Sequence, residues 1–297
     1  MSDYLSAVDS YILGVIEVLE EKGIEPRFLQ FGGELPEEKK IYVPTDARSE
    51  FLANRAMGDW AEETLSRALT IKLAATKVVK YGDSDATAAG EEGFKQQYLK
   101  AKEETRIYGK RPDLLLFDNS IKVGSDITGL PREEADNFAR KAKIGIEVRS
   151  SKQQALKYMA VKKEDGRTKG KAAGKIGLSF TVKVEDLKIV YRWLEVCKIP
   201  QIYTQVFFDS VFALNVLDIY KTIASGTDFT IESPDKSQNK ATIMIPITKG
   251  TQIAHFESAP KFDVEIKENR TGRIDAFVKP VGGDLVLDVL AFEKLLR

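Results

Sequence analysis

Three residues in two apolar segments have the types and spacing of a site for phosphate chemistry. Asp113 opens the apolar run at residues 113–117, and Glu147 and Arg149 lie in a second run at residues 144–149. If both runs are strands, Glu147 and Arg149 share a face, because residues two apart in a strand point the same way. A neighbouring strand would bring Asp113 beside them. Two carboxylates and a cation on one face make a site for a hard divalent cation and a phosphate group.

These residue types favour Mg²⁺ as the cofactor, since Mg²⁺ prefers oxygen ligands and keeps several waters. Asp113 and Glu147 would be the carboxylate ligands, and the backbone carbonyl of Val148 is a further candidate. Such a metal lowers the pKa of an attacking water and stabilises the leaving oxygen. Arg149 would stabilise the charge that develops on the phosphate oxygens. The predicted chemistry is therefore hydrolysis of a phosphodiester bond.

The composition excludes several other kinds of site. The chain has one Cys and one His, whereas a zinc site needs three or four ligands of these types. His255 has no nucleophile-elbow pattern near it, so we interpret it as structural, and Cys197 as a packed side chain. A single cysteine also excludes an internal disulfide and fits a cytoplasmic protein. No apolar run approaches the roughly 20 residues that span a bilayer, and we expect no membrane contact and no nucleotide cofactor.

The charges are balanced overall but unevenly distributed. The net charge is zero, yet residues 140–175 hold twelve Lys and Arg residues against three acidic ones. Within this region, residues 161–175 are rich in Lys and Gly, which predicts a surface loop. The loop is either a solvated linker or a segment that contacts phosphates or a groove. Its position directly after the Glu147 segment favours the second interpretation.

The hydrophobic pattern predicts the elements that would position these residues. Helices are expected at residues 3–22, 91–105, 132–142, 153–160, 185–196 and 210–223. A further helix is expected to begin after an N-cap at Thr45 or Asp46. Strands are expected at residues 111–117, 144–152, 202–208, 241–247, 261–266, 273–278 and 284–290, followed by a short C-terminal helix. This order predicts an α/β fold with a mixed central β-sheet flanked by helices.

We expect a single domain over residues 1–297, because no convincing linker divides the chain. Its core would cover roughly residues 45–225, and a β-rich C-terminal subregion roughly residues 226–297.

The two segments resemble the PD-(D/E)xK nuclease superfamily, in which Pro-Asp precedes an apolar strand and Glu-x-Lys follows in the next. Within it, the chain is similar to type II restriction endonucleases of the AccI-like family. The resemblance extends over residues 81–94, 108–117, 144–155, 178–195 and 199–213. It implies a restriction-endonuclease-like core and a Mg²⁺-dependent enzyme that cuts double-stranded DNA at a short palindrome as a homodimer.

Carried over to this chain, the resemblance makes Asp113 and Glu147 the metal-binding acids. The superfamily's lysine falls on Arg149, which cannot act as a general base at neutral pH because arginine stays charged. Lys152 lies three residues further on and is the alternative, if a helix begins at Ser150 or Ser151. Many members add an acid from an N-terminal helix, and this would be Glu62.

Base and phosphate contacts must come from other side chains, since Arg and Lys favour guanine edges and Asn and Gln favour adenine edges. The candidates are Lys110, Arg111, Gln153, Gln154, Lys162, Lys163, Arg167, Lys169 and Lys171, with Asn137, Arg140, Asn269, Arg270 and Arg273 as further ones. Two other functions stay open: a repair or recombination nuclease that recognises DNA structure, and a DNA-binding protein without catalysis.

Overall fold

The fold was analysed in a computed structural model. The structure describes residues 2–37, 41–44, 49–82, 89, 91–164, 177–232, 240–268 and 272–296.

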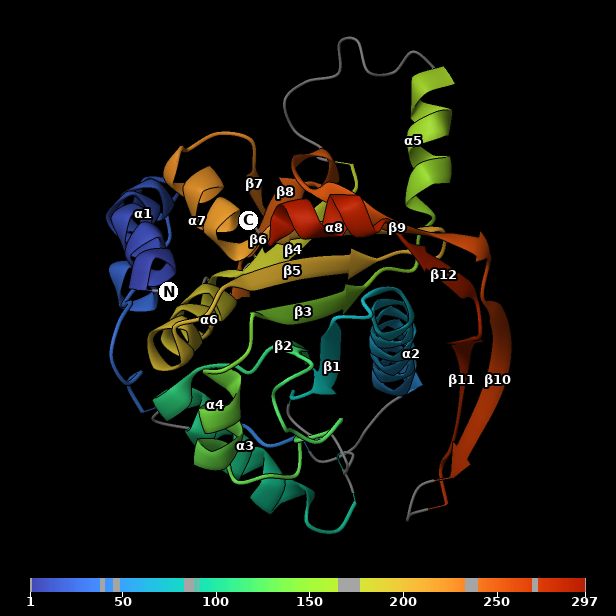
Figure 1. The fold of residues 1–297 in the computed structure, drawn as a ribbon. Coiled ribbons are helices and arrows are strands. Elements are labelled where there is room, and N and C mark those ends of the chain that lie inside the picture. Colours follow the sequence, from blue (N-terminus) through green and yellow to red (C-terminus); the bar gives the residue numbers. More distant parts are fainter. Residues whose placement is uncertain are drawn as a thin grey trace.

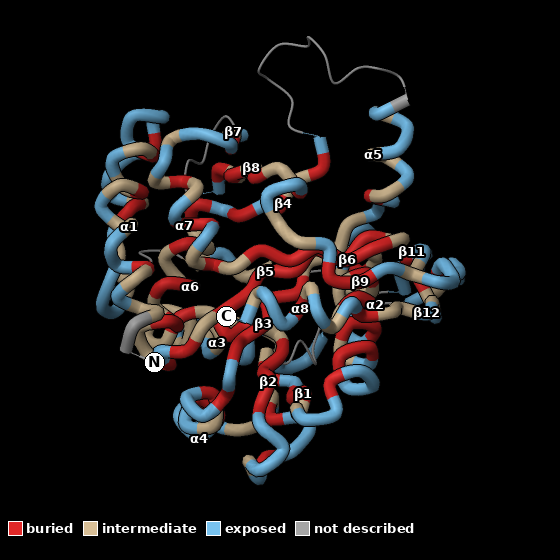
Figure 2. The backbone as a smooth tube through the Cα atoms, turned by 45° about the horizontal axis from the view of Figure 1, so that its top comes forward, coloured by how far each residue is buried: buried red, intermediate tan, exposed pale blue. Residues whose placement is uncertain are grey.

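A mixed seven-stranded sheet forms the centre of the molecule, in the order β1-β2-β3-β5-β6-β9-β12. Its strands are β1 (Thr76–Lys80), β2 (Leu114–Asp118), β3 (Ile144–Ser150), β5 (Gln201–Val206), β6 (Ser210–Asn215), β9 (Thr251–Ser258) and β12 (Asp284–Leu287). β3 and β5 are parallel, and the other neighbours in this sheet are antiparallel. β3 and β5 are buried along most of their length (Figure 2). The predicted α/β fold with a mixed central sheet is therefore confirmed.

Helices cover both faces of this sheet (Figure 1). The described helices are α1 (Ser2–Glu21), α2 (Ser49–Lys72), α3 (Phe94–Tyr108), α4 (Arg132–Ala139), α5 (Ala155–Glu164), α6 (Val184–Cys197), α7 (Val216–Ala224) and α8 (Val289–Leu295). Among the residues described, no helix is long and apolar enough to cross a membrane.

The apolar run of β2 shows how the sequence builds these two layers. Leu114 and Leu116 pack with Leu65 of α2, whereas Leu115 packs on the other side with Trp193 of α6. The alternation follows from the two-residue period of a strand. Burying one such leucine stabilises the fold by about 1.5–3 kcal/mol, so β2 is held from both sides.

Two smaller sheets complete the fold. β4 (Ser179–Lys183), β8 (Thr242–Pro246) and β7 (Thr230–Glu232) form a three-stranded sheet in the order β4-β8-β7. β10 (Lys261–Glu268) and β11 (Ile274–Val281) form a two-stranded ribbon beside α2 (Figure 1). Short 3₁₀ helices lie at Pro26–Phe28 and Ile247–Lys249.

Several predicted elements need correction. The helix expected at residues 210–223 is wrong in its first half, because Ser210–Asn215 forms β6 and the helix begins only at Val216. Asn215 ends the strand and caps the helix, since its side chain accepts a hydrogen bond from the Leu217 amide at 2.9 Å. A short apolar run alone does not distinguish a strand from a buried helix. Here residues 210–215 form a strand because they pair with β5 and β9.

The expected boundaries shift elsewhere too. Residues 161–164, expected in a loop, continue helix α5, and residues 165–175 of that loop lie outside the described residues. The expected caps Thr45 and Asp46 lie outside them as well, and α2 is described from Ser49. The strand expected at residues 284–290 ends at Leu287, because Asp288 caps α8 by accepting a hydrogen bond from the Ala291 amide at 2.9 Å. Four strands, β1, β4, β7 and β9, were not expected at all.

Candidate active site

A cavity of about 530 Å³ lies between α2, the end of β3 and the loop that precedes β2. Its lining contains Asp113, Glu147, Val148, Arg149, Lys152, Glu62, Lys110 and Arg111. Helix α2 supplies Glu62, and β3 supplies Glu147 and Arg149. The structure thus brings the five residues expected to be catalytic to one pocket.

The antiparallel register of β2 and β3 puts Asp113 beside Glu147. The last pair at this end is Leu114 with Ile146, and continuing the register by one residue puts Asp113 opposite Glu147. The Asp113 carboxylate accepts a hydrogen bond from the Val148 amide at 2.6 Å. Its backbone carbonyl accepts hydrogen bonds from the amides of Tyr81 and Gly82 at 2.9 and 3.1 Å. Asp113 is therefore fixed through both its backbone and its side chain.

Glu147 is 2% exposed and lies between two cations. One of its oxygens, Oε1, forms an ion pair with Lys110 Nζ and lies 3.1 Å from Arg149 Nε. The other oxygen, Oε2, is buried and has no hydrogen-bond partner. Burial opposes ionisation of Glu147, but Lys110 and Arg149 overcome it and hold the pKa of Glu147 below its usual value. Glu147 is thus a carboxylate with one oxygen available for a ligand.

The surroundings of Asp113 shift its pKa in the opposite direction. Burial, followed by the negative charges of Glu147 and Glu62, raises the pKa of Asp113 well above its ordinary value. Lys110 and the Val148 amide lower that pKa, but their effect is smaller. Three acids that share a pocket repel one another, and a bound cation would relieve this repulsion.

Arg149 faces inward from the end of β3. Its Nη2 donates a hydrogen bond to Asp186 of α6 at 3.2 Å, and its guanidinium lies 5.8 Å from the centre of the Tyr203 ring. Lys152 is in the bend between β3, which ends at Ser150, and α5, which begins at Ala155. Strand alternation therefore does not apply to Lys152, and it lines the same cavity as Glu147.

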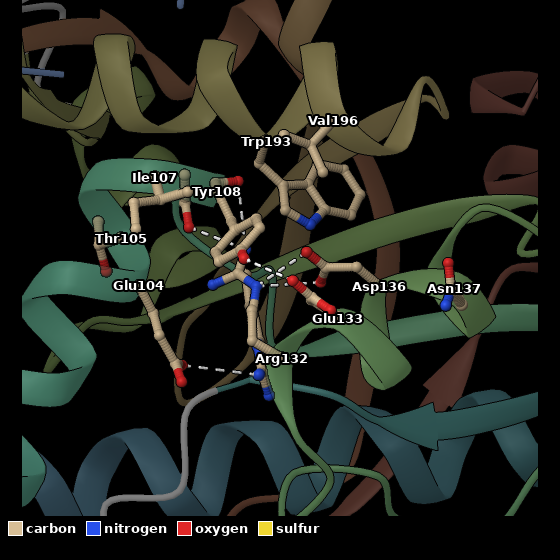
Figure 3. Close-up of polar contacts among 12 residues, drawn as sticks. Glu104, Thr105, Ile107, Tyr108, Arg132, Glu133, Asp136, Asn137, Trp193 and Val196 are labelled. Carbon is tan, nitrogen blue, oxygen red and sulfur yellow. Dashed lines mark hydrogen bonds and ion pairs between the residues drawn. The ribbon is translucent and has the colours of Figure 1, made fainter. Parts of the chain in front are cut away.

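A buried polar network holds the backbone just before Lys110 and Asp113 (Figure 3). Arg132 Nη2 donates to the carbonyls of Gly109 at 2.9 Å and Tyr108 at 3.2 Å. Arg132 Nε donates in turn to Asp136 at 2.9 Å. Gly109 has a φ of 79°, and a Cβ there would lie 2.2 Å from the Trp193 amide nitrogen, so only glycine fits. The network fixes the path of the chain into the pocket.

Comparison with known proteins identifies the family. A family model described as AccI restriction endonuclease matches residues 21–170 and 170–297, which is nearly the whole chain. The chain belongs to the AccI restriction endonuclease family. This membership confirms the resemblance that the sequence indicated, and it makes the protein a nuclease that hydrolyses DNA. No curated protein and no solved structure matches the chain.

The candidate DNA contacts of this restriction endonuclease lie in different environments. Arg111 lines the cavity but is only 4% exposed, because its guanidinium lies 5.3 Å from the centre of the Tyr81 ring and 3.8 Å from Glu104. Gln153 and Gln154 are exposed in the bend after β3. Lys162 and Lys163 lie on α5, which projects away from the sheet (Figure 1).

The remaining candidate DNA contacts are either paired with neighbouring side chains or outside the described residues. Arg140, directly after α4, donates a hydrogen bond to Asn137 at 2.7 Å, and Arg273 is paired with Asp275 at 2.9 Å. Arg167, Lys169, Lys171, Asn269 and Arg270 lie outside the described residues.

Sequence reasoning did not anticipate several members of the site. Lys110 was expected to contact phosphate, yet it pairs with Glu147 inside the cavity. Asp186 and Tyr203, which hold Arg149, were not singled out. Gln205 also lines the cavity, from the β5 position paired with Arg149. The available signal was the alternation in residues 202–206, which puts Tyr203 and Gln205 on one face.

Proposed function

We propose that the protein is a type II restriction endonuclease that hydrolyses phosphodiester bonds in double-stranded DNA at a short palindromic sequence, with Mg²⁺ as cofactor. Membership of the AccI family supports DNA as the substrate. The observation that carries the proposal is the shared pocket of Asp113, Glu147 and three cationic side chains, Lys110, Arg149 and Lys152. Such a pocket suits a phosphate group that reacts beside a divalent cation.

The donor atoms of the pocket fit Mg²⁺. Glu147 Oε2 is buried without a hydrogen-bond partner, and burial together with the charges of Glu147 and Glu62 raises the pKa of Asp113, so a bound cation would favour its ionised form. Within the described ranges, no group of three or more His, Cys, Asp or Glu side chains could hold a metal unaided. Mg²⁺ usually takes one or two carboxylates together with waters and substrate phosphate oxygens. Asp113, Glu147 and the Val148 carbonyl would therefore hold it together with DNA.

The protein residues have distinct proposed roles. When bound, the metal activates a water and stabilises the leaving oxygen. Glu62 orients the water from α2, on the side of Asp113. The superfamily pattern has a lysine where this chain has Arg149. Because Lys110 contacts Glu147, we assign the electrostatic role of that lysine to Lys110. Arg149 adds positive charge beside Glu147, and Lys152 is positioned to contact the scissile phosphate.

Digestion of plasmid and phage DNA tests the proposal. The parent protein is incubated with each DNA in Mg²⁺, and run-off sequencing locates the cuts. Asp113→Asn is compared with Asp118→Asn, a matched control at the far end of β2 whose carboxylate is exposed and paired with Lys143 at 2.6 Å. We expect discrete, reproducible fragments from the parent and the control, and none from Asp113→Asn.

Other outcomes point to the alternative functions. Cutting only at junctions, flaps or mismatches would identify a repair or recombination nuclease. If the parent and Asp113→Asn both bind DNA and neither cuts it in Mg²⁺ or Mn²⁺, the protein is a DNA-binding protein without catalysis.

A further inference from the structure

The β10–β11 ribbon has one face that carries mainly apolar side chains, most of them exposed. Cross-strand partners in a ribbon share a face, and here they are Phe262 with Pro280, Val264 with Val278 and Ile266 with Ala276. Ile274 extends the same face at the far end of the ribbon, where its cross-strand partner is the exposed Glu268. The exposed fractions are 53% for Phe262, 70% for Val264, 69% for Ile266, 66% for Ile274 and 51% for Val278. We call the seven apolar residues of this side the ribbon face: Phe262, Val264, Ile266, Ile274, Ala276, Val278 and Pro280, of which Pro280 is buried.

The opposite face already holds the ribbon in place. Phe277 is buried there and packs with Leu52 of α2. On that face Lys279 pairs with Glu265 at 2.5 Å and Lys267 pairs with Glu91 at 2.8 Å. A half-exposed sheet normally turns its charged side outward and its apolar side inward. The reversed arrangement here indicates that the ribbon face is built to be covered.

The ribbon face borders the candidate active site. Phe262, Ala276 and Val278 line a cavity of about 450 Å³ together with Phe208 and with Met57 and Lys152. Met57 and Lys152 also line the cavity that contains Asp113 and Glu147. Phe262 meets Phe208 edge to face, with ring centres 5.0 Å apart. Whatever covers the ribbon face therefore lies next to the catalytic pocket.

We propose that a second copy of this chain covers the ribbon face, with the two ribbon faces packed against each other about a two-fold axis. The seven residues are all apolar, so the face offers no cation to DNA phosphates. A two-fold contact joins identical patches, and a uniformly apolar patch is complementary to itself. The exposed apolar area is on the order of 600 Å², which is most of the roughly 800 Å² that each partner buries in a standard interface.

The contact would also stabilise the ribbon itself. A two-stranded ribbon is marginally stable in water on its own, and this one is covered on one side only. Together with the proposed function, on which this consequence rests, the contact would bring two catalytic pockets to one duplex. Each pocket would then cut one strand of a palindromic site.

Analytical ultracentrifugation of the full-length protein without DNA tests the inference. The variant Val264→Glu/Ile266→Glu puts two charges on each ribbon face. The matched control Leu13→Glu/Ile71→Glu adds the same charges at positions that are 67% and 69% exposed on α1 and α2. We expect the parent and the control to sediment as dimers of the 33.2 kDa chain. We expect the ribbon variant to dissociate with a dimer Kd raised at least about 100-fold.

Circular dichroism and thermal melting establish that the ribbon variant is folded. If it is not, Val264→Thr/Ile266→Thr replaces it, since threonine keeps the β-branched shape and the strand preference. A parent that stays monomeric at micromolar concentrations would overturn the inference, and so would a ribbon variant that dimerises like the parent. A monomeric parent whose DNA affinity falls in the ribbon variant would make the face a DNA contact instead. A dimer that depends on the ribbon face but cuts no DNA would support this inference and contradict the proposed function.

Discussion

At the scale of single residues, the site depends on two acids in opposite electrostatic states. Lys110 and Arg149 keep Glu147 ionised, whereas burial and the charges of Glu147 and Glu62 favour the protonated form of Asp113. Groups whose surroundings displace their pKa values in opposite directions are typical of functional sites. The arrangement costs stability in the metal-free protein, because a buried acid must ionise beside two others.

Replacing Asp113 by Asn should therefore stabilise the metal-free protein while abolishing cleavage. Because the pKa of Asp113 is raised in the folded protein, protonated Asp113 contributes fully to stability below pH 3.8, the ordinary pKa of an aspartate. This contribution is lost as the pH rises through the raised pKa of the folded state. The melting temperature of Asp113→Asn should exceed that of the parent at pH 8, by a margin that narrows at pH 5. Adding Mg²⁺ should raise the melting temperature of the parent but not that of the variant. A lower melting temperature for the variant at both pH values would contradict this account of Asp113.

Lys110 should prove more important for catalysis than its place before β2 suggests. It is the lysine that pairs with Glu147, so Lys110→Met should lower the single-turnover cleavage rate by about 100-fold or more. Lys143→Met is the matched control, since Lys143 pairs with Asp118 at the surface, and it should cut at the parental rate. A variant Lys110→Met that cuts normally but binds DNA less tightly would return Lys110 to the phosphate-contacting role first expected.

At the scale of elements, the catalytic residues are held by strand ends, and a helix extends beyond them. Asp209 fixes the start of α5, because its carboxylate accepts hydrogen bonds from the amides of Ala155 at 2.8 Å and Leu156 at 2.9 Å. The helix thus begins a few residues after Arg149 and projects from the body with Lys162 and Lys163 near its end (Figure 1). This geometry suits an arm that reaches along DNA.

If α5 contacts phosphates, Lys162→Ala/Lys163→Ala should weaken DNA binding nearly equally for all sequences. The slope of log K against log salt concentration should fall by about one for each lysine that contacts a phosphate. Fluorescence anisotropy with two unrelated duplexes at several salt concentrations measures both effects. The variant Lys221→Ala/Lys249→Ala, on α7 and after β8, is the control and should leave the slope unchanged. An unchanged slope in the α5 variant would exclude this role for the helix.

The sequence predicted the catalytic strands better than their surroundings. Residues 113–117 and 144–149 are apolar runs interrupted by acids, and their periodicity is enough to predict which side chains share a face. The pairing of Lys110 with Glu147, and of Arg149 with Asp186, depends on how distant segments meet, which local periodicity does not contain. Residues 210–215 were mistaken for helix for the same reason, since only their neighbours β5 and β9 make them a strand.

At the scale of the whole molecule, the fold places Asp113 and Glu147 where a cavity opens between α2 and the end of β3. Helix α2 lies on one side of this opening with Glu62, and α6 braces Arg149 from the other side through Asp186. The β10–β11 ribbon stands next to α2, so its apolar ribbon face and the catalytic pocket are neighbours. Cleavage and assembly are therefore expected to depend on adjoining surfaces, which suits an enzyme that must cut both strands.

The most direct test of the central claim is the single-turnover cleavage of DNA by Glu147→Gln in Mg²⁺. This change keeps the size of the side chain and an oxygen for Lys110, but it removes the charge and alters Oε2, the oxygen without a hydrogen-bond partner. The account predicts DNA binding at the parental level with cleavage reduced by at least about 1,000-fold. Glu185→Gln, in the first turn of α6 and outside the residues that line the cavity, should cut like the parent. Cleavage by Glu147→Gln at the parental rate would show that this pocket is not where the DNA is cut.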